Sequence, residues 1–168
     1  TLDVAQDLYT SGLISYPRTS SQMLPTTIGY SRIVRALSQQ PEYQVLGDKL
    51  LQKTNLVPNN GQKTDPAHPA IFPTGHVPKG LDQRSLKVYD LIARRFLATF
   101  ADAALRETMS VRIDVNGEFF VASRTTTKEK GWHEFYGQYA KFKEEELPQL
   151  VRGETVIVKK LELLEKET

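Results

Sequence analysis

The chain has 168 residues, of which 39% are hydrophobic, with a formal net charge of +2 and a mean hydropathy of −0.41. These values are typical of a soluble globular chain of about one domain, and no apolar run approaches the roughly 20 residues that a membrane span needs. Because there is no cysteine, disulfide frameworks and thiolate metal sites are excluded.

The positive charge is unevenly distributed along the chain. Residues 1–102 carry 11 Lys and Arg against 8 Asp and Glu, whereas residues 103–168 carry 11 against 12. An excess of this size is too small to indicate nucleic-acid binding by itself. The chain opens within a helical pattern, without Met or a signal-peptide pattern, so we expect an internal fragment of a longer protein.

The first predicted element is the end of an amphipathic helix over residues 1–11. Its apolar face at helical spacing consists of Leu2, Ala5, Leu8 and Tyr9. Gly12 follows as a left-handed stop. Gln6 lies on the more polar side, where a surface position and a DNA contact are equally compatible. The apolar run at 13–15 predicts a buried strand that leads into Tyr16.

Pro17 separates a tyrosine from an arginine. The residue before a proline favours an extended conformation, in which residues i and i+2 face the same side, so Tyr16 and Arg18 should project together. An activated phenol can attack a phosphodiester, and a guanidinium matches phosphate oxygens. On three residues alone, a packed tyrosine beside a solvated arginine is the commoner arrangement.

Three hydroxyl residues follow the arginine. They could contact phosphates, as hydroxyls do in protein–DNA interfaces, or they could form turns and cap a helix. These residues are Thr19, Ser20 and Ser21.

Three further helices are predicted, from Pro25, over 43–51 and over 81–100. Arg94 and Arg95 are expected on the solvated face of the last one. Its predicted core positions are Leu86, Tyr89, Ile92, Ala93, Phe96, Leu97 and Phe100.

A proline-rich loop carries His68 between the second and third of these helices, with prolines at 66, 69 and 73. The prolines restrict the backbone, so the histidine has a rigid mount. Its side chain could donate to a phosphate or move a proton. Taken alone, a loop histidine is more often structural or exposed than catalytic. His76 is expected at the surface.

The C-terminal part changes to a period of two. Residues 108–115 alternate, Asn116-Gly117 is a strong hairpin signal, and residues 118–124 pair back. A charge run at 141–146 predicts a solvated loop, and residues 156–164 predict a strand. Aromatic side chains between the hairpin and this charge run could stack bases but more often join a core. They are Trp132, Phe135 and Tyr136.

Two segments resemble the signatures of type IA DNA topoisomerases. Residues 5–21 read AQDLYTSGLISYPRTSS, and the family pattern is A-Q-x-L-Y-x-x-G-x-I-[ST]-Y-x-R-T-[DS]-S. Residues 67–75 read AHPAIFPTG, and the second family signature is A-H-x-A-I-x-P-T. The version here is most similar to the archaeal branch. Ser20 stands where many members have aspartate, which leaves the role of this position open.

The resemblance implies roles for particular residues. Tyr16 would be the nucleophile that cleaves one DNA strand and becomes linked to its 5′ phosphate. Arg18 and His68 would stabilise the phosphate and its developing charge. Single-stranded DNA would be positioned by Gln6, Thr19, Ser20 and Ser21.

The resemblance also implies an α+β fold with two parts. Residues 1–102 would form a mainly helical active-site domain, truncated at its N-terminus, and residues 103–168 a β-rich part of the arch domain. The parent enzyme would cleave a strand, pass another and religate without ATP, relaxing negative supercoils in the cytoplasm, in association with the nucleoid. Its partners would be DNA, preferably single-stranded, and the rest of the parent polypeptide, with no membrane involved.

Magnesium would belong to the parent enzyme and bind outside this chain, on a separate acidic domain. We therefore expect no dedicated Mg²⁺ site here and an inactive isolated fragment.

The sequence is also compatible with other functions. The chain could be a DNA-binding or scaffolding module without covalent chemistry. A recombinase-like tyrosine enzyme would need several arginines and histidines around its tyrosine at a different spacing, and the Ala-His-Pro-Ala-Ile segment argues against it. Reverse gyrase shares both motifs, and the sequence does not distinguish it from a simple topoisomerase.

Overall fold

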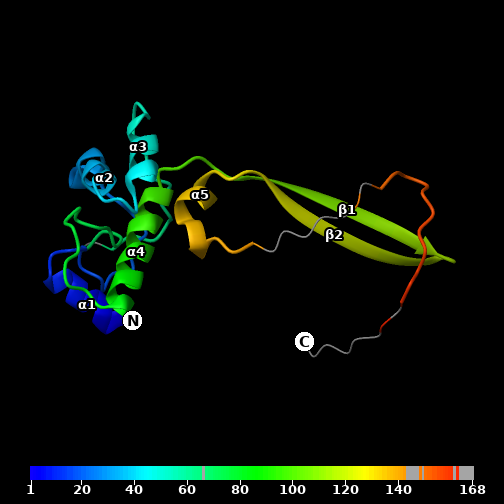
Figure 1. The fold of residues 1–168 in the computed structure, drawn as a ribbon, viewed down its shortest axis with the longest axis horizontal. Helices are drawn as coiled ribbons and strands as arrows, with labels where there is room; N and C mark the ends of the chain where they lie inside the picture. Colours follow the sequence, from blue (N-terminus) through cyan, green and yellow to red (C-terminus); the bar gives the residue numbers. More distant parts are fainter. Residues whose placement is uncertain (66, 143–147, 149, 161, 163–168) are drawn as a thin grey trace.

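The computed structural model describes residues 1–65, 67–142, 148, 150–160 and 162. Helices precede one antiparallel hairpin, which confirms the predicted α+β class. Figure 1 shows the helices gathered at one end and the hairpin projecting away from them. In chain order the elements are α1 (Leu2–Thr10), the 3₁₀ turn η1 (Thr26–Ile28), α2 (Tyr30–Ser38), α3 (Gln44–Leu51), α4 (Gln83–Ala98), β1 (Leu105–Val115), β2 (Glu118–Glu129), α5 (Trp132–Tyr136) and η2 (Gly137–Tyr139).

Helix α4 is the centre of the hydrophobic core. Tyr89, Phe96 and Leu97 on this helix are at most 2% exposed. The helix packs against α1, α3 and α5. It begins at Asp82, whose side chain accepts a hydrogen bond from the Ser85 N–H at 2.7 Å and so satisfies one of the unpaired donors of the first turn.

The predicted apolar faces are largely correct, but three of their residues in α1 and α4 are exposed. In α1, Ala5 and Leu8 are buried, whereas Leu2 and Tyr9 are 50% and 40% exposed. In α4, the predicted residues near the C-terminal end, Phe96 and Leu97, are buried, whereas Leu86 in the first turn is 43% exposed. Helical spacing gives the face on which a residue lies, but it does not show whether another segment covers that part of the face.

The helix predicted from Pro25 is interrupted. Residues Thr26–Ile28 form only the 3₁₀ turn, and Gly29 then takes a left-handed conformation with φ of 74°. Helix α2 begins one residue later. A glycine reaches positive φ at little cost, which allows the chain to change direction here.

The strand predicted at 13–15 is not a regular strand. Ile14 makes a single antiparallel bridge to Pro73, and proline has no N–H with which to extend a ladder. Two hydrogen bonds flank the bridge, from Ser15 N–H to the Phe72 carbonyl at 2.9 Å and from Thr74 N–H to the Leu13 carbonyl at 3.0 Å. This pairing still joins the two motif segments.

The predicted hairpin is confirmed. Val115 lies opposite Glu118, and the two turn residues between them have positive φ, 53° at Asn116 and 92° at Gly117, as a type I′ turn requires. Strand β2 continues to Glu129, five residues beyond the predicted end at 124.

After the hairpin the chain returns to the helical end, where α5 packs against α4. Phe135 is 3% exposed within the core, and the neighbouring aromatic residues pack partly against it, which favours the core interpretation over base stacking. Residues 156–160 form no strand, contrary to the prediction for 156–164. Residues 161 and 163–164, and the charge run at 143–146, lie outside the described residues.

Candidate active site

Backbone hydrogen bonds join the loop after α1 to the loop before α4. Besides the bridge at Ile14, the Gln22 N–H donates to the Lys63 carbonyl at 2.8 Å and the Ala70 N–H donates to the Met23 carbonyl at 2.9 Å. Each bond links a residue of the first loop to one of the second. The two motif segments, far apart in sequence, are therefore neighbours along most of their length.

This pairing brings Tyr16 and His68 together. Their ring centroids lie 4.5 Å apart with the planes inclined at 46°. Tyr16 also meets the ring of Tyr9 edge to face, with centroids 5.3 Å apart and an interplanar angle of 77°. Both Tyr16 and His68 are partly exposed, so the pair lies at the surface, where an extended ligand could reach it.

The main chain of His68 is held on both sides. Its N–H donates to Asp65 Oδ1 at 3.1 Å, and the Ala67 N–H donates to the same oxygen at 2.9 Å. Its carbonyl accepts a hydrogen bond from Thr19 Oγ1 at 3.3 Å. These backbone hydrogen bonds, from Ala67 first and then from His68, hold the pKa of Asp65 below its ordinary value.

Arg18 and Gln6 are not joined to this cluster by any described contact. Arg18 is exposed, and its guanidinium has no partner among the described residues. Gln6 is partly exposed; its main-chain carbonyl accepts a hydrogen bond from Thr10 Oγ1, and no described contact engages its side chain. An arginine that spends its donors on no protein group can offer all of them to an anion.

Two of the three predicted hydroxyl residues take part in turns. The Ser21 N–H donates to Thr19 Oγ1 at 3.0 Å, and the Met23 N–H donates to Ser21 Oγ at 3.1 Å. This is the turn chemistry that the sequence left open as an alternative. Ser20 is exposed, and its backbone N–H also lowers the pKa of the Asp65 carboxyl.

Sequence reasoning missed two neighbours of the site, Tyr9 and Asp65. The helical spacing predicts Tyr9 on the core face of its helix. In the structure its side chain is exposed and contacts the Tyr16 ring. Asp65 precedes a proline just ahead of the Ala-His pair, and an Asp that accepts hydrogen bonds from the backbone two and three residues later is a recognisable turn signal.

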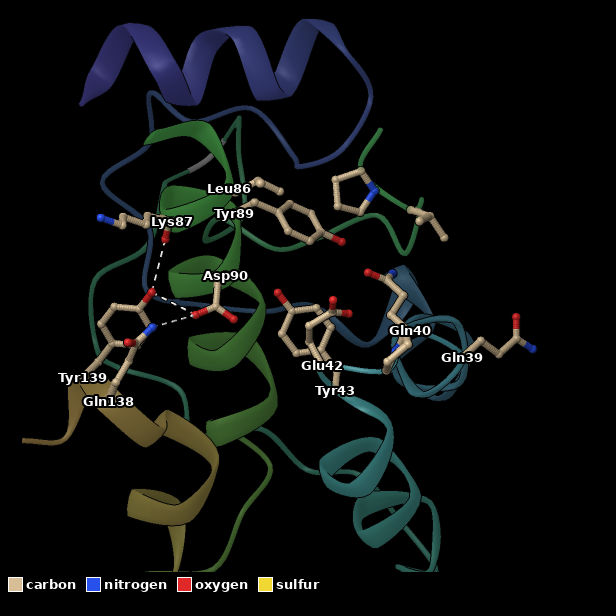
Figure 2. Close-up of a pocket in the computed structure, with 13 residues that line it drawn as sticks. Gln39, Gln40, Glu42, Tyr43, Leu86, Lys87, Tyr89, Asp90, Gln138 and Tyr139 are labelled. Carbon is tan, nitrogen blue, oxygen red and sulfur yellow. Dashed lines mark hydrogen bonds between the residues drawn. The ribbon is translucent and has the colours of Figure 1, made fainter. Parts of the chain in front are cut away.

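A separate cavity of about 520 Å³ lies between α4, the loop before α3 and η2, and no predicted site residue lines it. Figure 2 shows Tyr139 and Gln138 directed towards Asp90 of α4, and the Tyr139 hydroxyl donates to Asp90 Oδ2 at 2.9 Å. Burial, together with Asp90, raises the pKa of Tyr43 far above its ordinary value. Gln40 is 4% exposed, and its Nε2 has no partner within the described part of the chain.

No group of three or more His, Asp or Glu side chains in the described part of the chain is placed to hold a metal ion. None of the described helices combines the length and apolarity needed to cross a membrane.

The whole chain, residues 1–168, matches the family model described as DNA topoisomerase. Over its full length it is 44% identical to DNA topoisomerase 1 of Pyrococcus horikoshii, covering 25% of that protein, and 42% identical to DNA topoisomerase 1 of Methanothermobacter thermautotrophicus, covering 23%. It is 32% identical to DNA topoisomerase 3 of Dictyostelium discoideum over 97% of the chain and 20% of that protein.

The chain therefore belongs to the DNA topoisomerase family, as its two motifs predicted. It is similar to archaeal topoisomerases 1 and, more distantly, to topoisomerases 3. It spans about a quarter of the length of the archaeal relatives named above.

Proposed function

We propose that this chain is the active-site segment of a type IA DNA topoisomerase and that Tyr16 is its nucleophile. The observation that carries the proposal is the contact between Tyr16 and His68, with ring centroids 4.5 Å apart. Each residue comes from a different family motif, and the fold places the two side by side at the surface.

The proposed reaction is a transesterification. Tyr16 Oη attacks a DNA phosphorus and forms an Oη–P bond, the P–O3′ bond breaks, the phenol loses its proton and the 3′ oxygen gains one. The reverse step religates the strand, so the phosphodiester energy is retained and no ATP is needed. Strand passage between the two steps would change the linking of the DNA and relax negative supercoils.

Arg18 and His68 are proposed to stabilise the phosphate. Arg18 has no partner among the described residues, so its planar donors can bind the oxygens that gain charge in the transition state. His68 stands against the attacking ring. Gln6 and the exposed Ser20 would contact single-stranded DNA. Ser21 Oγ accepts a hydrogen bond in its turn and keeps its O–H donor for a phosphate, whereas Thr19 donates its own O–H to the His68 carbonyl and can offer DNA only an acceptor.

We infer that the active enzyme needs more polypeptide than this chain. Residues 1–102 would belong to its helical active-site domain and residues 103–168 to a β-rich arch. The described residues offer no cluster that fits a divalent cation, so Mg²⁺ would bind elsewhere in the enzyme, and no step above is assigned to it. The same reasoning covers a simple topoisomerase and reverse gyrase, whose helicase part would also lie outside this sequence.

The test uses a full-length polypeptide that contains this chain. The protein is trapped with a short single-stranded oligonucleotide, digested, and searched by mass spectrometry for a tyrosine that carries a nucleotide. We expect the adduct on Tyr16 and its complete loss in Tyr16→Phe. Tyr136→Phe, which removes another partly exposed phenol from α5, should leave the adduct in place.

Two results would contradict this function. An adduct on another tyrosine would show that the motif match assigned the wrong nucleophile. Unchanged oligonucleotide binding with no adduct in any sample would favour the DNA-binding module instead, since such a module needs no covalent step.

A further inference from the structure

The His68 loop has little regular structure to hold it. Residues 52–82 contain neither a helix nor a strand in their described part, apart from the bridge at Pro73. A histidine on such a segment would sample many orientations unless specific contacts fix its main chain. The structure provides these contacts at both polar groups of His68, its N–H and its carbonyl.

Asp65 supplies the contact on the N–H side. One carboxylate oxygen accepts two consecutive backbone N–H groups, from Ala67 at 2.9 Å and from His68 at 3.1 Å. Asp65 therefore holds two consecutive main-chain N–H groups of the loop that carries His68. The link from this loop to the loop of Tyr16 and Arg18 is made by Thr19, whose Oγ1 donates to the His68 carbonyl at 3.3 Å.

We propose that Asp65 is a positioning residue for strand cleavage, which fixes the His68 main chain so that the imidazole stands against the Tyr16 ring. This inference rests on the function proposed above. Asp65 itself touches neither the tyrosine ring nor, in this proposal, the DNA. It acts through the two N–H groups that it accepts, with Thr19 completing the grip at the His68 carbonyl.

The charge of Asp65 is a cost at a site that binds phosphates, because a carboxylate repels DNA. The role of Asp65 should therefore lie in the hydrogen bonds that its oxygen accepts and not in its charge. The prediction separates two substitutions. Asp65→Asn keeps an oxygen that can accept the Ala67 and His68 N–H groups and removes the charge, whereas Asp65→Ala removes both.

The experiment measures single-turnover cleavage of a saturating fluorescent oligonucleotide by the full-length polypeptide, together with the oligonucleotide Kd and the melting temperature. We expect Asp65→Ala to cleave about tenfold or more slowly with an unchanged Kd, since small displacements of a reacting group cost rates of this order. Asp65→Asn should remain within about threefold of the unsubstituted protein, because its amide oxygen retains the hydrogen bonds.

Asp82→Ala is the matched control. Asp82 also accepts a backbone N–H, that of Ser85 at 2.7 Å, and this hydrogen bond also lowers its pKa, but no described contact joins it to Tyr16, Arg18 or His68. Loss of this cap should lower the melting temperature and leave the cleavage rate unchanged. A rate loss confined to Asp65→Ala is then a local effect on the site.

Three outcomes would overturn the inference. Cleavage by Asp65→Ala at the unsubstituted rate would show that the loop holds His68 without this residue. An equal loss in Asp65→Asn and Asp65→Ala would make the charge the important property. A loss of similar size in Asp82→Ala would attribute the effect to stability.

Tyr16→Phe, run in parallel, distinguishes the two levels of the argument. If it still forms a covalent adduct, the proposed function fails and this inference fails with it. If the adduct is lost in Tyr16→Phe and Asp65→Ala cleaves normally, only the inference about Asp65 fails.

Discussion

The two residues that flank Pro17 have different surroundings in the folded chain. The Tyr16 ring contacts the rings of Tyr9 and His68, so its position is set by protein contacts. Arg18 is exposed and has no partner among the described residues. A side chain without intramolecular partners contributes little to folding, and in the proposed function the ligand of Arg18 is a DNA phosphate.

Arg18→Ala should therefore affect activity and not stability. We expect the free energy of unfolding to stay within about 0.5 kcal/mol, as for exposed positions without contacts. Cleavage of a single-stranded oligonucleotide should fall by about 10²–10³, the usual cost of removing one donor from developing charge. Denaturant unfolding and single-turnover cleavage measure the two quantities. Cleavage at the normal rate would contradict the role assigned to Arg18.

The segment that enters the hairpin, at Asp102 and Ala103, contacts the segment that leaves it, at Gly131 and Trp132. We call this contact the crossing. The Trp132 N–H donates to the Asp102 carbonyl at 2.9 Å, and Lys53 Nζ donates to the Phe100 carbonyl at 2.9 Å and pairs with Asp102 at 2.8 Å. Gly131 lies at this crossing with φ of 47°. A Cβ at Gly131 would lie 2.4 Å from the Ala103 carbonyl oxygen, closer than backbone atoms allow.

Gly131→Ala should displace α5 or destabilise the whole helical end. Gly80→Ala is the control, because Gly80 also has positive φ, 65°, but nothing lies within 4 Å of its Cβ position. The control should cost about 1–2 kcal/mol, which is the conformational penalty alone. Gly131→Ala should cost clearly more in urea unfolding. Equal losses would mean that the crossing relaxes around the methyl group.

At the scale of the whole molecule, the chain spans about a quarter of its archaeal relatives, and we propose that further polypeptide completes the enzyme. The chain's net charge of +2 gives weak general attraction to DNA. The residues that the structure describes offer no metal cluster. The Tyr16 and His68 rings are partly exposed at the surface.

The isolated chain 1–168, supplied with Mg²⁺, should leave a supercoiled plasmid unrelaxed on an agarose gel. A full-length polypeptide that contains the chain should relax the same plasmid in the same buffer, which shows that the conditions permit the reaction. Relaxation by the purified chain alone would contradict the proposal that metal binding and strand passage depend on further polypeptide.

The helices and the hairpin turn could be predicted from the amino-acid sequence alone, because they depend on local spacing. Helical periodicity located the four longer helices, and Asn116-Gly117 located the hairpin turn, because both signals act within a few residues. The two motifs predict membership of the DNA topoisomerase family, and the match of the whole chain to the family model confirms it. They also named Tyr16, Arg18 and His68, roles that the experiments above will test.

The contacts among these residues could not be predicted from the sequence and are seen in the folded chain. Tyr16 and His68 lie on separate loops, and no local rule sets the distance between them; the hydrogen bonds between the loops do. The grip of Asp65 on His68, the exposure of Leu86 and the burial of Phe135 likewise depend on what packs where. Spacing along the chain fixes the face on which a residue lies, but its neighbours in space follow from the packing of segments distant in sequence.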